Sequence, residues 1–338
     1  MDGQLEFSLN DFNQQTDNIP AEKHLSLPEK IEESRRILRL ACDMSFTYYG
    51  EPLICCYSGG KDSDVLLHLA ESTLKPNEFE VLNSHTSVDY PETVYHIRNV
   101  FKRLNDKGIK TTINYPRDKD GNHITMWNLI LKKNMLPLRV SRSCCSVLKE
   151  TSTPNRLAAM GVRADESNGR KGRDVFAIRA ESKKEAHFYS YQHAEEVHKE
   201  SQEIDDPNWD CTLIKTMKEH KDTIVNPIYY WSDNDVWDYI RQESIETNPL
   251  YERGLTRIGC LLCPMASYKL KKWQIANYPT YKKAYVHACD QLLEKWKKTG
   301  KQTEWKTGEE MFNWWIEEDK HNVRGQISLF DQPITDKD

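Results

Sequence analysis

A glycine-rich turn carries the clearest chemical signal in this sequence. It reads Ser58-Gly59-Gly60-Lys61-Asp62-Ser63 and joins the apolar run 53–57 to a segment with helical spacing. A turn that opens a helix gathers backbone N–H groups at the positive end of the helix dipole, where phosphate binds well. The glycines let the backbone approach an anion closely, and Lys61 adds a positive charge. We therefore expect a phosphate-binding loop here; the alternative is a tight turn that happens to contain a lysine.

Four of the nine cysteines form two pairs whose spacing suits metal ligation. Cys144 and Cys145 are adjacent, and Cys260 and Cys263 are separated by two residues. A Cys-x-x-Cys pair is a common half-site for zinc or an iron–sulfur cluster. Adjacent side chains point in different directions, which suits the separate iron atoms of a [4Fe–4S] cluster better than one tetrahedral zinc ion. The sequence predicts a cluster, with zinc, or buried and reactive thiols, as the alternatives.

Strands and helices are expected to alternate around the glycine-rich turn. Short apolar runs predict strands, and apolar residues at three- and four-residue spacing predict helices. The expected strands are 53–57, 79–83 and 109–115, with others near 158–163 and 223–227, and the expected helices are 27–49, 91–104, 124–133 and one that starts at the turn. Because βαβ units build a parallel sheet, the sequence predicts an α/β fold with a doubly wound, mostly parallel sheet.

The same patterns predict how the chain is divided. A flexible leader at 1–27 is followed by an α/β domain at 28–265, which contains a polar and acidic surface insertion at 182–210. Helical patterns at 269–277, 281–298 and 309–321 predict a helical C-terminal region at 266–322. Residues 323–338 are expected to form a flexible tail.

The composition and the N-terminal sequence predict the cellular compartment of the protein. The 338 residues have a net charge of −5 and contain no apolar run long enough to cross a membrane. The N-terminus lacks the basic and apolar pattern of a secretory signal. Nine cysteines without such a signal indicate a reducing compartment. We therefore expect a cytoplasmic protein with no membrane partner.

Five segments resemble those of a known group of nucleotide-binding proteins. Ser-Gly-Gly-Lys-Asp-Ser is similar to the PP-loop of the N-type ATP pyrophosphatases, and the whole set is similar to the phosphoadenosine phosphosulfate (PAPS) reductase family. The other four segments are Asp89-Tyr90-Pro91-Glu92-Thr93, Arg142-Ser143-Cys144-Cys145 with Leu148-Lys149, Gly161-Val162-Arg163-Ala164-Asp165-Glu166-Ser167, and Asn226-Pro227-Ile228 with Trp231, Asp235, Val236 and Trp237. The resemblance covers approximately residues 50–265 and implies the adenine nucleotide α-hydrolase-like fold.

The resemblance also implies an adenine-nucleotide site. The loop is expected to hold the phosphate or sulfate end of ATP or of a sulfonucleotide, either PAPS or adenosine phosphosulfate (APS), with Mg²⁺ accompanying ATP. The implied binding residues are Ser58, Gly59, Gly60, Lys61, Asp62, Ser63, Asp89, Arg163 and Glu166, and the implied catalytic residues among them are Lys61, Asp62 and Arg163. An arginine fork suits phosphate or sulfate geometry. Alternatively, Arg163 forms a surface ion pair with Asp165 or Glu166.

The cysteines help to choose between reactions in this group. A double cysteine followed by a distant Cys-x-x-Cys resembles the [4Fe–4S] signature of assimilatory APS reductases. The catalytic thiol of sulfonucleotide reductases lies in a C-terminal Glu-Cys-Gly-x-His motif, whereas the last cysteine here is Cys289, in Val-His-Ala-Cys-Asp. We therefore expect ATP-dependent adenylation with release of pyrophosphate, for transfer of sulfur from a donor such as a cysteine desulfurase. The alternatives are a PAPS or APS reductase that forms sulfite, and a non-catalytic nucleotide-binding module.

A basic and aromatic stretch makes nucleic acid a candidate acceptor. Residues 265–301 contain nine lysines against two acidic residues, and Trp273, Tyr278, Tyr281, Tyr285 and Trp296 are interleaved with them. Lysines could follow phosphates while exposed rings stack on bases. The alternative is a solvated helical face whose aromatic rings lie in the core.

A short peptide near the end of the chain suggests a second partner. Gln326-Ile327-Ser328-Leu329-Phe330 resembles the peptide by which bacterial DNA enzymes dock onto the sliding clamp. Such a peptide, which here begins with Gln326, acts by placing Leu329 and Phe330 in an apolar pocket, from a tail that is free to reach it. The alternative is a tail that packs these two side chains on its own domain.

Overall fold

The chain forms two compact units in the computed structural model, which describes residues 25–150, 152–166, 170–178, 187–203 and 211–317. Unit 1 comprises Met1–Asn83, His96–Thr112 and Thr153–Pro249, and unit 2 comprises Ser84–Tyr95, Ile113–Ser152 and Leu250–Asp338. Most of the expected leader and the whole expected tail, with Gln326, Leu329 and Phe330, lie outside the described residues. Within the described ranges, every helix is too short or too polar to cross a membrane.

The core of unit 1 is a seven-stranded sheet in the order β3-β2-β1-β4-β7-β5-β6. The strands are β1 (Leu53–Cys56), β2 (Phe79–Ser84), β3 (Thr111–Asn114), β4 (Leu157–Ala159), β5 (Phe176–Ile178), β6 (Phe188–Tyr189) and β7 (Thr223–Val225). β1 pairs in parallel with β2 and β4, and β4 pairs in parallel with β7. β5 is antiparallel to both β7 and β6. The predicted α/β fold with a mostly parallel sheet is therefore confirmed.

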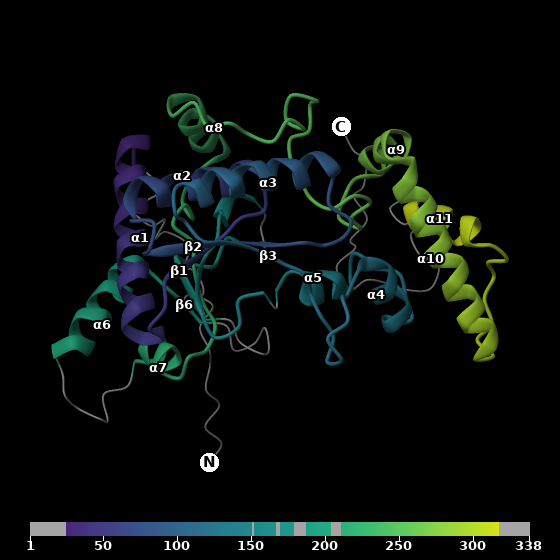
Figure 1. Ribbon diagram of the computed structural model, residues 1–338, viewed down its shortest axis with the longest axis horizontal. Coiled ribbons are helices and arrows are strands. Elements are labelled where there is room, and N and C mark those ends of the chain that lie inside the picture. Colours follow the sequence, from purple (N-terminus) through teal and green to yellow (C-terminus); the bar gives the residue numbers. More distant parts are fainter. Residues whose placement is uncertain (1–24, 151, 167–169, 179–186, 204–210, 318–338) are drawn as a thin grey trace, which may run out of the picture. The chain divides into compact units, whose positions relative to one another are not determined.

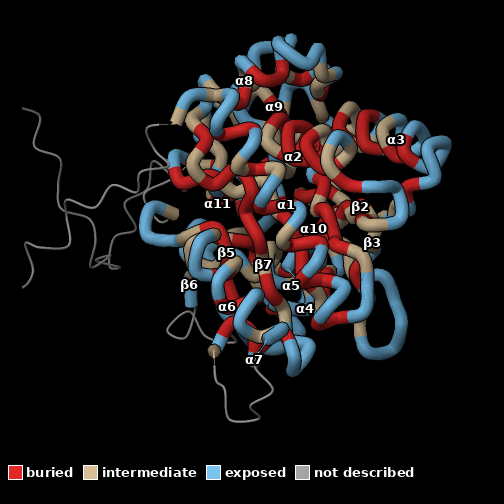
Figure 2. Tube along the Cα trace, turned by 90° about the vertical axis from the view of Figure 1, so that its left-hand side faces the viewer, coloured by how far each residue is buried: buried red, intermediate tan, exposed pale blue. Residues whose placement is uncertain are grey.

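β1 lies where the strand order reverses. The chain proceeds from β1 to β2 and β3 on one side, and then returns to β4 on the other side of β1. Leu53, Ile54 and Cys55 are buried, as expected for a central strand covered on both faces. Figure 2 shows the same concentration of burial along β5 and β7. In open α/β sheets, ligands bind beyond the carboxyl ends of the strands at such a switch point, and the glycine-rich turn follows β1 there.

Six helices of the described chain belong wholly or partly to unit 1. They are α1 (Leu27–Tyr49), α2 (Lys61–Thr73), α6 (Tyr191–Glu203), α7 (Thr212–Lys218), α8 (Asp233–Gln242) and α3 (Pro91–Asp106), whose first residues belong to unit 2. α1 contacts α2, α6 and α7, while α2 contacts α8 and β1 (Figure 1). The predicted helix at 27–49 is confirmed at both ends, because Ser26 caps its start and Gly50 ends it in a left-handed conformation.

Helix α6 lies inside the segment expected to be a polar surface insertion. It buries Ala194, Val197 and His198. The His198 ring lies 2.8 Å from the carboxylate of Asp43 and 2.8 Å from the hydroxyl of Tyr48, both on α1. The sequence did not predict this helix, because its inward face carries one small residue, one valine and one histidine instead of a repeating apolar pattern.

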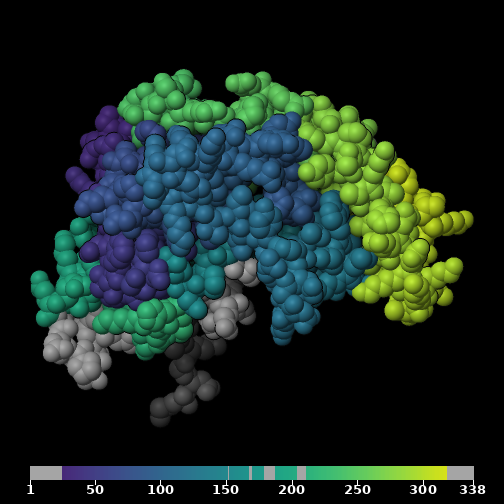
Figure 3. All heavy atoms as spheres, in the orientation of Figure 1, coloured from purple at the N-terminus to yellow at the C-terminus, as the bar shows by residue number. Residues whose placement is uncertain are grey.

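Unit 2 is built mainly from five helices among the described residues. They are α4 (Met126–Lys133), α5 (Ser143–Leu148), α9 (Tyr268–Asn277), α10 (Pro279–Lys298) and α11 (Gly308–Ile316). Tyr285, Phe312 and Trp315 lie at the centre of their shared core. In the space-filling view, α9, α10 and α11 pack against one another as a green-to-yellow block (Figure 3). The expected helical C-terminal region is confirmed, and its last described helix ends at Ile316.

Candidate functional site

The glycine-rich turn closes on itself at the start of α2. Gly59 has a φ of 71°, in the left-handed region that favours glycine. Its carbonyl accepts a hydrogen bond of 3.0 Å from the buried amide of Asn248. The Ser63 hydroxyl donates to the Gly60 carbonyl at 2.7 Å and accepts from the Gly60 amide at 3.1 Å. The turn is therefore preformed, and a bound anion would compete with the Ser63 hydroxyl for the Gly60 amide.

Gly161 brings the segment after β4 against this turn. A Cβ atom at this position would lie 2.8 Å from the carbonyl oxygen of Asp62 and 3.2 Å from the amide nitrogen of Ser63. The first distance is shorter than real Cβ contacts show and the second is unusually tight, so the close approach needs a glycine. Because of this approach, Arg163, which lies two residues after Gly161, contacts the first turn of α2.

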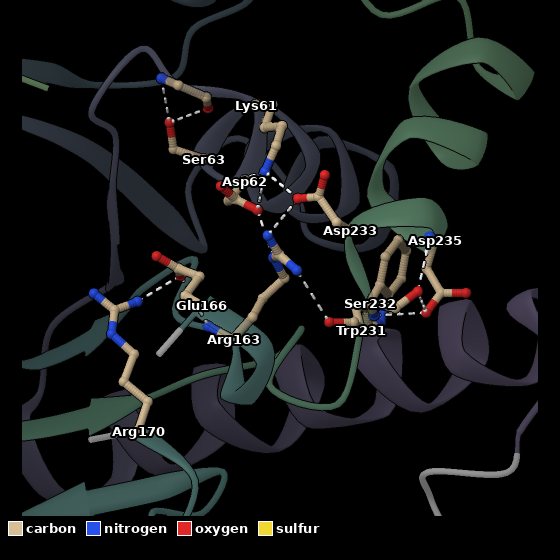
Figure 4. A network of polar contacts seen from close by, with 11 residues as sticks. Lys61, Asp62, Ser63, Arg163, Glu166, Arg170, Trp231, Ser232, Asp233 and Asp235 are labelled. Carbon is tan, nitrogen blue, oxygen red and sulfur yellow. Dashed lines mark hydrogen bonds and ion pairs between the residues drawn. The ribbon is translucent and has the colours of Figure 1, made fainter. Parts of the chain in front are cut away.

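Four charged side chains meet at this point. Nε of Arg163 donates to Asp62 at 2.6 Å, and the terminal nitrogen Nη2 of Arg163 donates to Asp233 at 2.9 Å. Nζ of Lys61 lies 3.2 Å from the Asp62 carboxylate and 2.8 Å from that of Asp233. Figure 4 shows the Arg163 guanidinium between the two carboxylates, with the Lys61 ammonium directed to the same place. Arg163 is therefore not part of a surface ion pair with Asp165 or Glu166.

The members of this group come from the carboxyl ends of three neighbouring parallel strands. Lys61 and Asp62 follow β1, Arg163 follows β4, and Asp233 follows β7 as the first residue of α8. The Arg163 guanidinium also donates to the carbonyl of Trp231 at 3.3 Å. The sheet order thus assembles residues that are distant in the sequence at its topological switch point.

Glu166 acts on the backbone of Arg163. Its carboxylate accepts a hydrogen bond of 3.2 Å from the amide nitrogen of Arg163 and forms an ion pair with Arg170. Arg163 directly precedes a single 3₁₀ turn, Ala164–Glu166, and Glu166 is the last residue of that turn. Glu166 therefore positions Arg163, and Figure 4 shows its carboxylate directed to Arg170 rather than to the Lys61 ammonium.

The two cations are buried, while one of their anionic partners is exposed. The side chains of Arg163 and Lys61 are 3% and 6% exposed, whereas that of Asp233 is 61% exposed. Partial burial by itself raises the pKa of Asp233, but hydrogen bonds and charge from Lys61 and Arg163 lower it overall. Burial alone lowers the pKa of Arg163, but Asp62, with smaller contributions from Glu166 and Asp233, raises it overall. Asp233 and Arg163 are consequently charged at neutral pH, and a phosphate that binds the two cations competes with the carboxylates that already contact them.

Three supporting residues were not identified in the sequence. Asp233 and Asn248 complete the charge group and the turn, but each reaches the loop only through the fold. Asp64, in the first turn of α2, is buried and accepts a hydrogen bond of 2.6 Å from the Tyr57 hydroxyl. Burial raises the pKa of Asp64. Its position directly after the glycine-rich turn was the one available signal for a role in anchoring the loop.

The four cysteines singled out in the sequence belong to unit 2, and all are free thiols. The pKa of Cys144 is raised first by its hydrogen bond with Cys145 and by burial, and then by charge on Cys260 and Cys263. The same hydrogen bond lowers the pKa of Cys145. Cys144 and Cys260 pack against the same core cluster of unit 2, although more than a hundred residues separate them in the sequence.

Charged groups accompany this cysteine set. Negative charge on Cys260 is the main cause of the raised pKa of Lys149. Asp89, which was expected to bind the nucleotide, lies in unit 2; its backbone pairs with that of Cys260, and its carboxylate accepts from the Thr86 amide at 2.8 Å. Within the described ranges, no three histidine, cysteine or acidic side chains are gathered so that they could hold one metal ion. Four neighbouring thiols suit an iron–sulfur cluster by their chemistry, and a cluster binds its ligands at separate corners.

The basic stretch at 265–301 separates into lysines and core aromatics. Tyr285 and Trp296 are buried in the core of unit 2, so these two rings cannot stack on bases. Trp273, Tyr278 and Tyr281 are half-buried. Lysines such as Lys269, Lys283 and Lys297 are exposed. The stretch is therefore a solvated basic face over an aromatic core, with a smaller set of accessible rings.

Comparisons with known proteins identify the family of the chain. Residues 52–266 match the family described as phosphoadenosine phosphosulfate reductase domain. An uncharacterized protein of Methanocaldococcus jannaschii is 26% identical over 223 residues, which cover 63% of this chain and 36% of that protein. The adenosine 5'-phosphosulfate reductase of Staphylococcus saprophyticus is 20% identical over 257 residues, 74% of this chain and 84% of the relative. The sulfate adenylyltransferase subunit 2 of Nocardia farcinica is 27% identical over 251 residues, 71% of this chain and 69% of the relative. The chain spans only about a third of the length of the Methanocaldococcus protein.

The close approach of Gly161 gives a test of the site. We expect Gly161→Ala to push the segment after β4 away from α2, at a cost of about 1–3 kcal/mol in the free energy of unfolding, and to weaken nucleotide binding. Gly172→Ala is the matched control, because its Cβ would meet no atom within 4 Å. Denaturant unfolding and calorimetry would compare the two variants. Equal stability and equal nucleotide affinity would contradict the packing described here.

Proposed function

Because the chain belongs to the phosphoadenosine phosphosulfate reductase domain family, we propose that it binds ATP at residues 58–63 and activates a substrate for sulfur transfer. In the proposed reaction, a substrate oxygen attacks the α-phosphate of ATP, the bond to the β-phosphate breaks, and pyrophosphate leaves. A sulfur nucleophile then displaces AMP from the adenylated substrate. Nucleic acid is the proposed acceptor, and a persulfide-forming enzyme such as a cysteine desulfurase is the proposed sulfur donor.

The observation that carries the proposal is the buried pair of Lys61 and Arg163 at the start of α2. Fixed cations beside a helix N-terminus stabilise the charge that develops on a leaving pyrophosphate. The triphosphate would replace Asp62 and Asp233 on these cations. Two carboxylates released in this way suit Mg²⁺, which prefers oxygen ligands, and Asp62 and Asp233 are therefore the proposed protein ligands of the Mg²⁺ that accompanies ATP.

The last cysteine of the sequence supports transfer rather than reduction. A sulfonucleotide reductase needs an accessible thiolate to attack sulfur. Cys289 is fully buried in α10, and burial raises its pKa to about 12. A thiol in this state is neither accessible nor ionised at neutral pH. The reductase remains the second candidate, because the Staphylococcus relative carries that name and covers most of the chain.

We also propose that Cys144, Cys145, Cys260 and Cys263 bind a [4Fe–4S] cluster. The support is that Cys144 and Cys260 pack against the same core of unit 2, and that two separate pairs of thiols can bind different corners of a cluster. Such a cluster would supply iron and sulfide chemistry to unit 2. In this proposal Lys149 offsets part of the negative charge of the thiolates.

Docking to the sliding clamp is a separate proposal. It rests on Gln326, Leu329 and Phe330, which lie outside the described residues. The proposed role of the peptide is to bring the enzyme to DNA, and it is independent of the nucleotide site.

Product analysis tests the proposed reaction. With Mg²⁺, ATP, a nucleic-acid acceptor and a persulfide donor, we expect formation of pyrophosphate and AMP in equal amounts, because adenylation releases the first and sulfur transfer the second. A parallel incubation with APS or PAPS and a thiol donor should release no sulfite. Sulfite from a sulfonucleotide, without pyrophosphate from ATP, would assign the chain to the reductases. Nucleotide binding without formation of any product would indicate a non-catalytic nucleotide-binding module.

Metal analysis tests the cysteine assignment. We expect Cys260→Ser to lose most of its iron and inorganic sulfide after anaerobic purification, because one of four thiolate ligands is removed. Cys211→Ser is the matched control, since Cys211 is the N-cap residue of α7 in unit 1 and serine is a favourable residue there. Full iron content in Cys260→Ser, or equal loss in both variants, would contradict the assignment.

A further inference from the structure

A cluster around Arg253 in unit 2 is used by neither the phosphate-binding turn nor the cysteine set. The Arg253 guanidinium lies over the ring of Trp273, 5.1 Å from its centroid. One terminal nitrogen, Nη1, donates to Glu92 at 2.6 Å and to the hydroxyl of Tyr278 at 3.1 Å. The other, Nη2, donates to the side-chain carbonyl of Asn277 at 3.3 Å. All five residues belong to unit 2, and Arg253 itself is exposed.

These contacts fix the guanidinium as a flat, exposed plate. Three of its five N–H groups donate hydrogen bonds, and Trp273 covers one of its two faces. The centroid of the Tyr278 ring lies farther away, at 6.0 Å, and Tyr278 meets the guanidinium through its hydroxyl. The remaining face is the part best placed to receive a ligand. An anion that needs a fork of in-plane donors would have to displace Glu92, whose negative charge also repels it. The plate therefore suits a planar, aromatic ligand that stacks.

The plate rests on a rigid base. Trp273 and Tyr278 pack against a small core made of Tyr90, Leu250 and Leu261. The Tyr278 hydroxyl donates to Glu92 at 2.8 Å, so the carboxylate that holds Arg253 is itself held. Stacking on such a plate needs little ordering of side chains, because they are already fixed.

Two further exposed residues lie one helical turn from members of the cluster. Lys269 precedes Trp273 by four positions on α9, which places it one turn away on the same face of the helix, and it is exposed. Tyr95 follows Glu92 by three positions on α3, also on the same face, and its side chain is 65% exposed. An exposed lysine and an exposed ring near the plate suit the alternation of phosphate and base along a single strand.

We infer that the Arg253–Trp273 plate stacks an unpaired nucleobase of a single-stranded nucleic acid, with Lys269 binding an adjacent phosphate and Tyr95 available to a second base. The inference rests on the proposed function, whose acceptor it specifies as an unpaired strand. Arginine planes and aromatic rings are the usual stacking surfaces for splayed bases, while lysines contribute affinity that does not depend on sequence. An acidic peptide fits less well, because Glu92 lies in the centre of the cluster.

A binding experiment on the full-length protein tests the inference. Fluorescence anisotropy would compare a labelled oligothymidylate with a strand of the same length in which abasic sites replace the bases. The wild-type protein should bind the base-containing strand about 10-fold more tightly, in the range expected for loss of stacking on one or two bases. Arg253→Lys keeps the positive charge but removes the planar guanidinium. This variant should lose the preference for the base-containing strand and keep its affinity for the abasic strand unchanged. Trp273→Phe, which keeps a ring, should retain most of this preference.

Arg257→Lys, at an exposed arginine of the same segment, is the matched control and should behave as the wild type. Equal binding of the two strands by the wild-type protein would overturn the inference without any variant. An equal loss on both strands in Arg253→Lys would also overturn it, because the contact would then be one of charge. Pyrophosphate release from ATP is measured separately. If no pyrophosphate is released but the base-containing strand is still preferred, only the proposed function is refuted. If pyrophosphate is released but neither strand is preferred, only the stacking inference is refuted.

Discussion

Two buried cations that must each keep an anionic partner are the constraint on which the loop site depends. Removing one partner from a buried ion pair costs about 3–5 kcal/mol, because an uncompensated charge is left behind. Lys61 and Arg163 satisfy this requirement with Asp62 and Asp233. The partners are unequal, since Asp62 lies in the turn itself whereas Asp233 is a largely exposed residue at the start of α8. Asp233 is consequently the partner that a phosphate can replace at least cost.

This arrangement has a consequence for selectivity. A site with two cations and two carboxylates carries no net charge, so it does not attract small anions strongly. A polyphosphate that arrives with Mg²⁺ brings both an anion for the cations and a cation for the displaced carboxylates. The proposed preference for Mg²⁺ with ATP thus follows from charge balance at the turn. The close packing of Gly161 against Asp62 holds Arg163 where it can contact either the carboxylates or a phosphate.

Local signals in the sequence were sufficient for the turn and for most elements of the sheet. A buried strand, two glycines and a helix occur within about twenty residues, so the phosphate-binding turn can be predicted from local sequence without knowledge of the fold. Asp233 and Asn248 could not be found in this way, because each meets the loop only through the order of β1, β4 and β7. Arg163 was identified by resemblance, and its burial between two carboxylates became visible only in the structure. Helix α6 was missed because its inward face lacks a repeating apolar pattern, and the aromatic residues of α10 were ambiguous because core rings and stacking rings share the same spacing.

The exchange of a carboxylate for a phosphate is tested most directly by calorimetric titration of metal-free ATP into two variants. Lys61→Ala should lose about 1.5–3 kcal/mol of binding free energy, because one charged hydrogen bond is removed. Asp233→Asn should bind about 2- to 5-fold more tightly, because a competing partner worth up to about 1 kcal/mol is gone. Asp238→Asn, at an exposed position of the same helix, should match the wild type. Opposite changes in the first two variants are the predicted result, and unchanged affinity in both would contradict the assignment of the turn as the phosphate site.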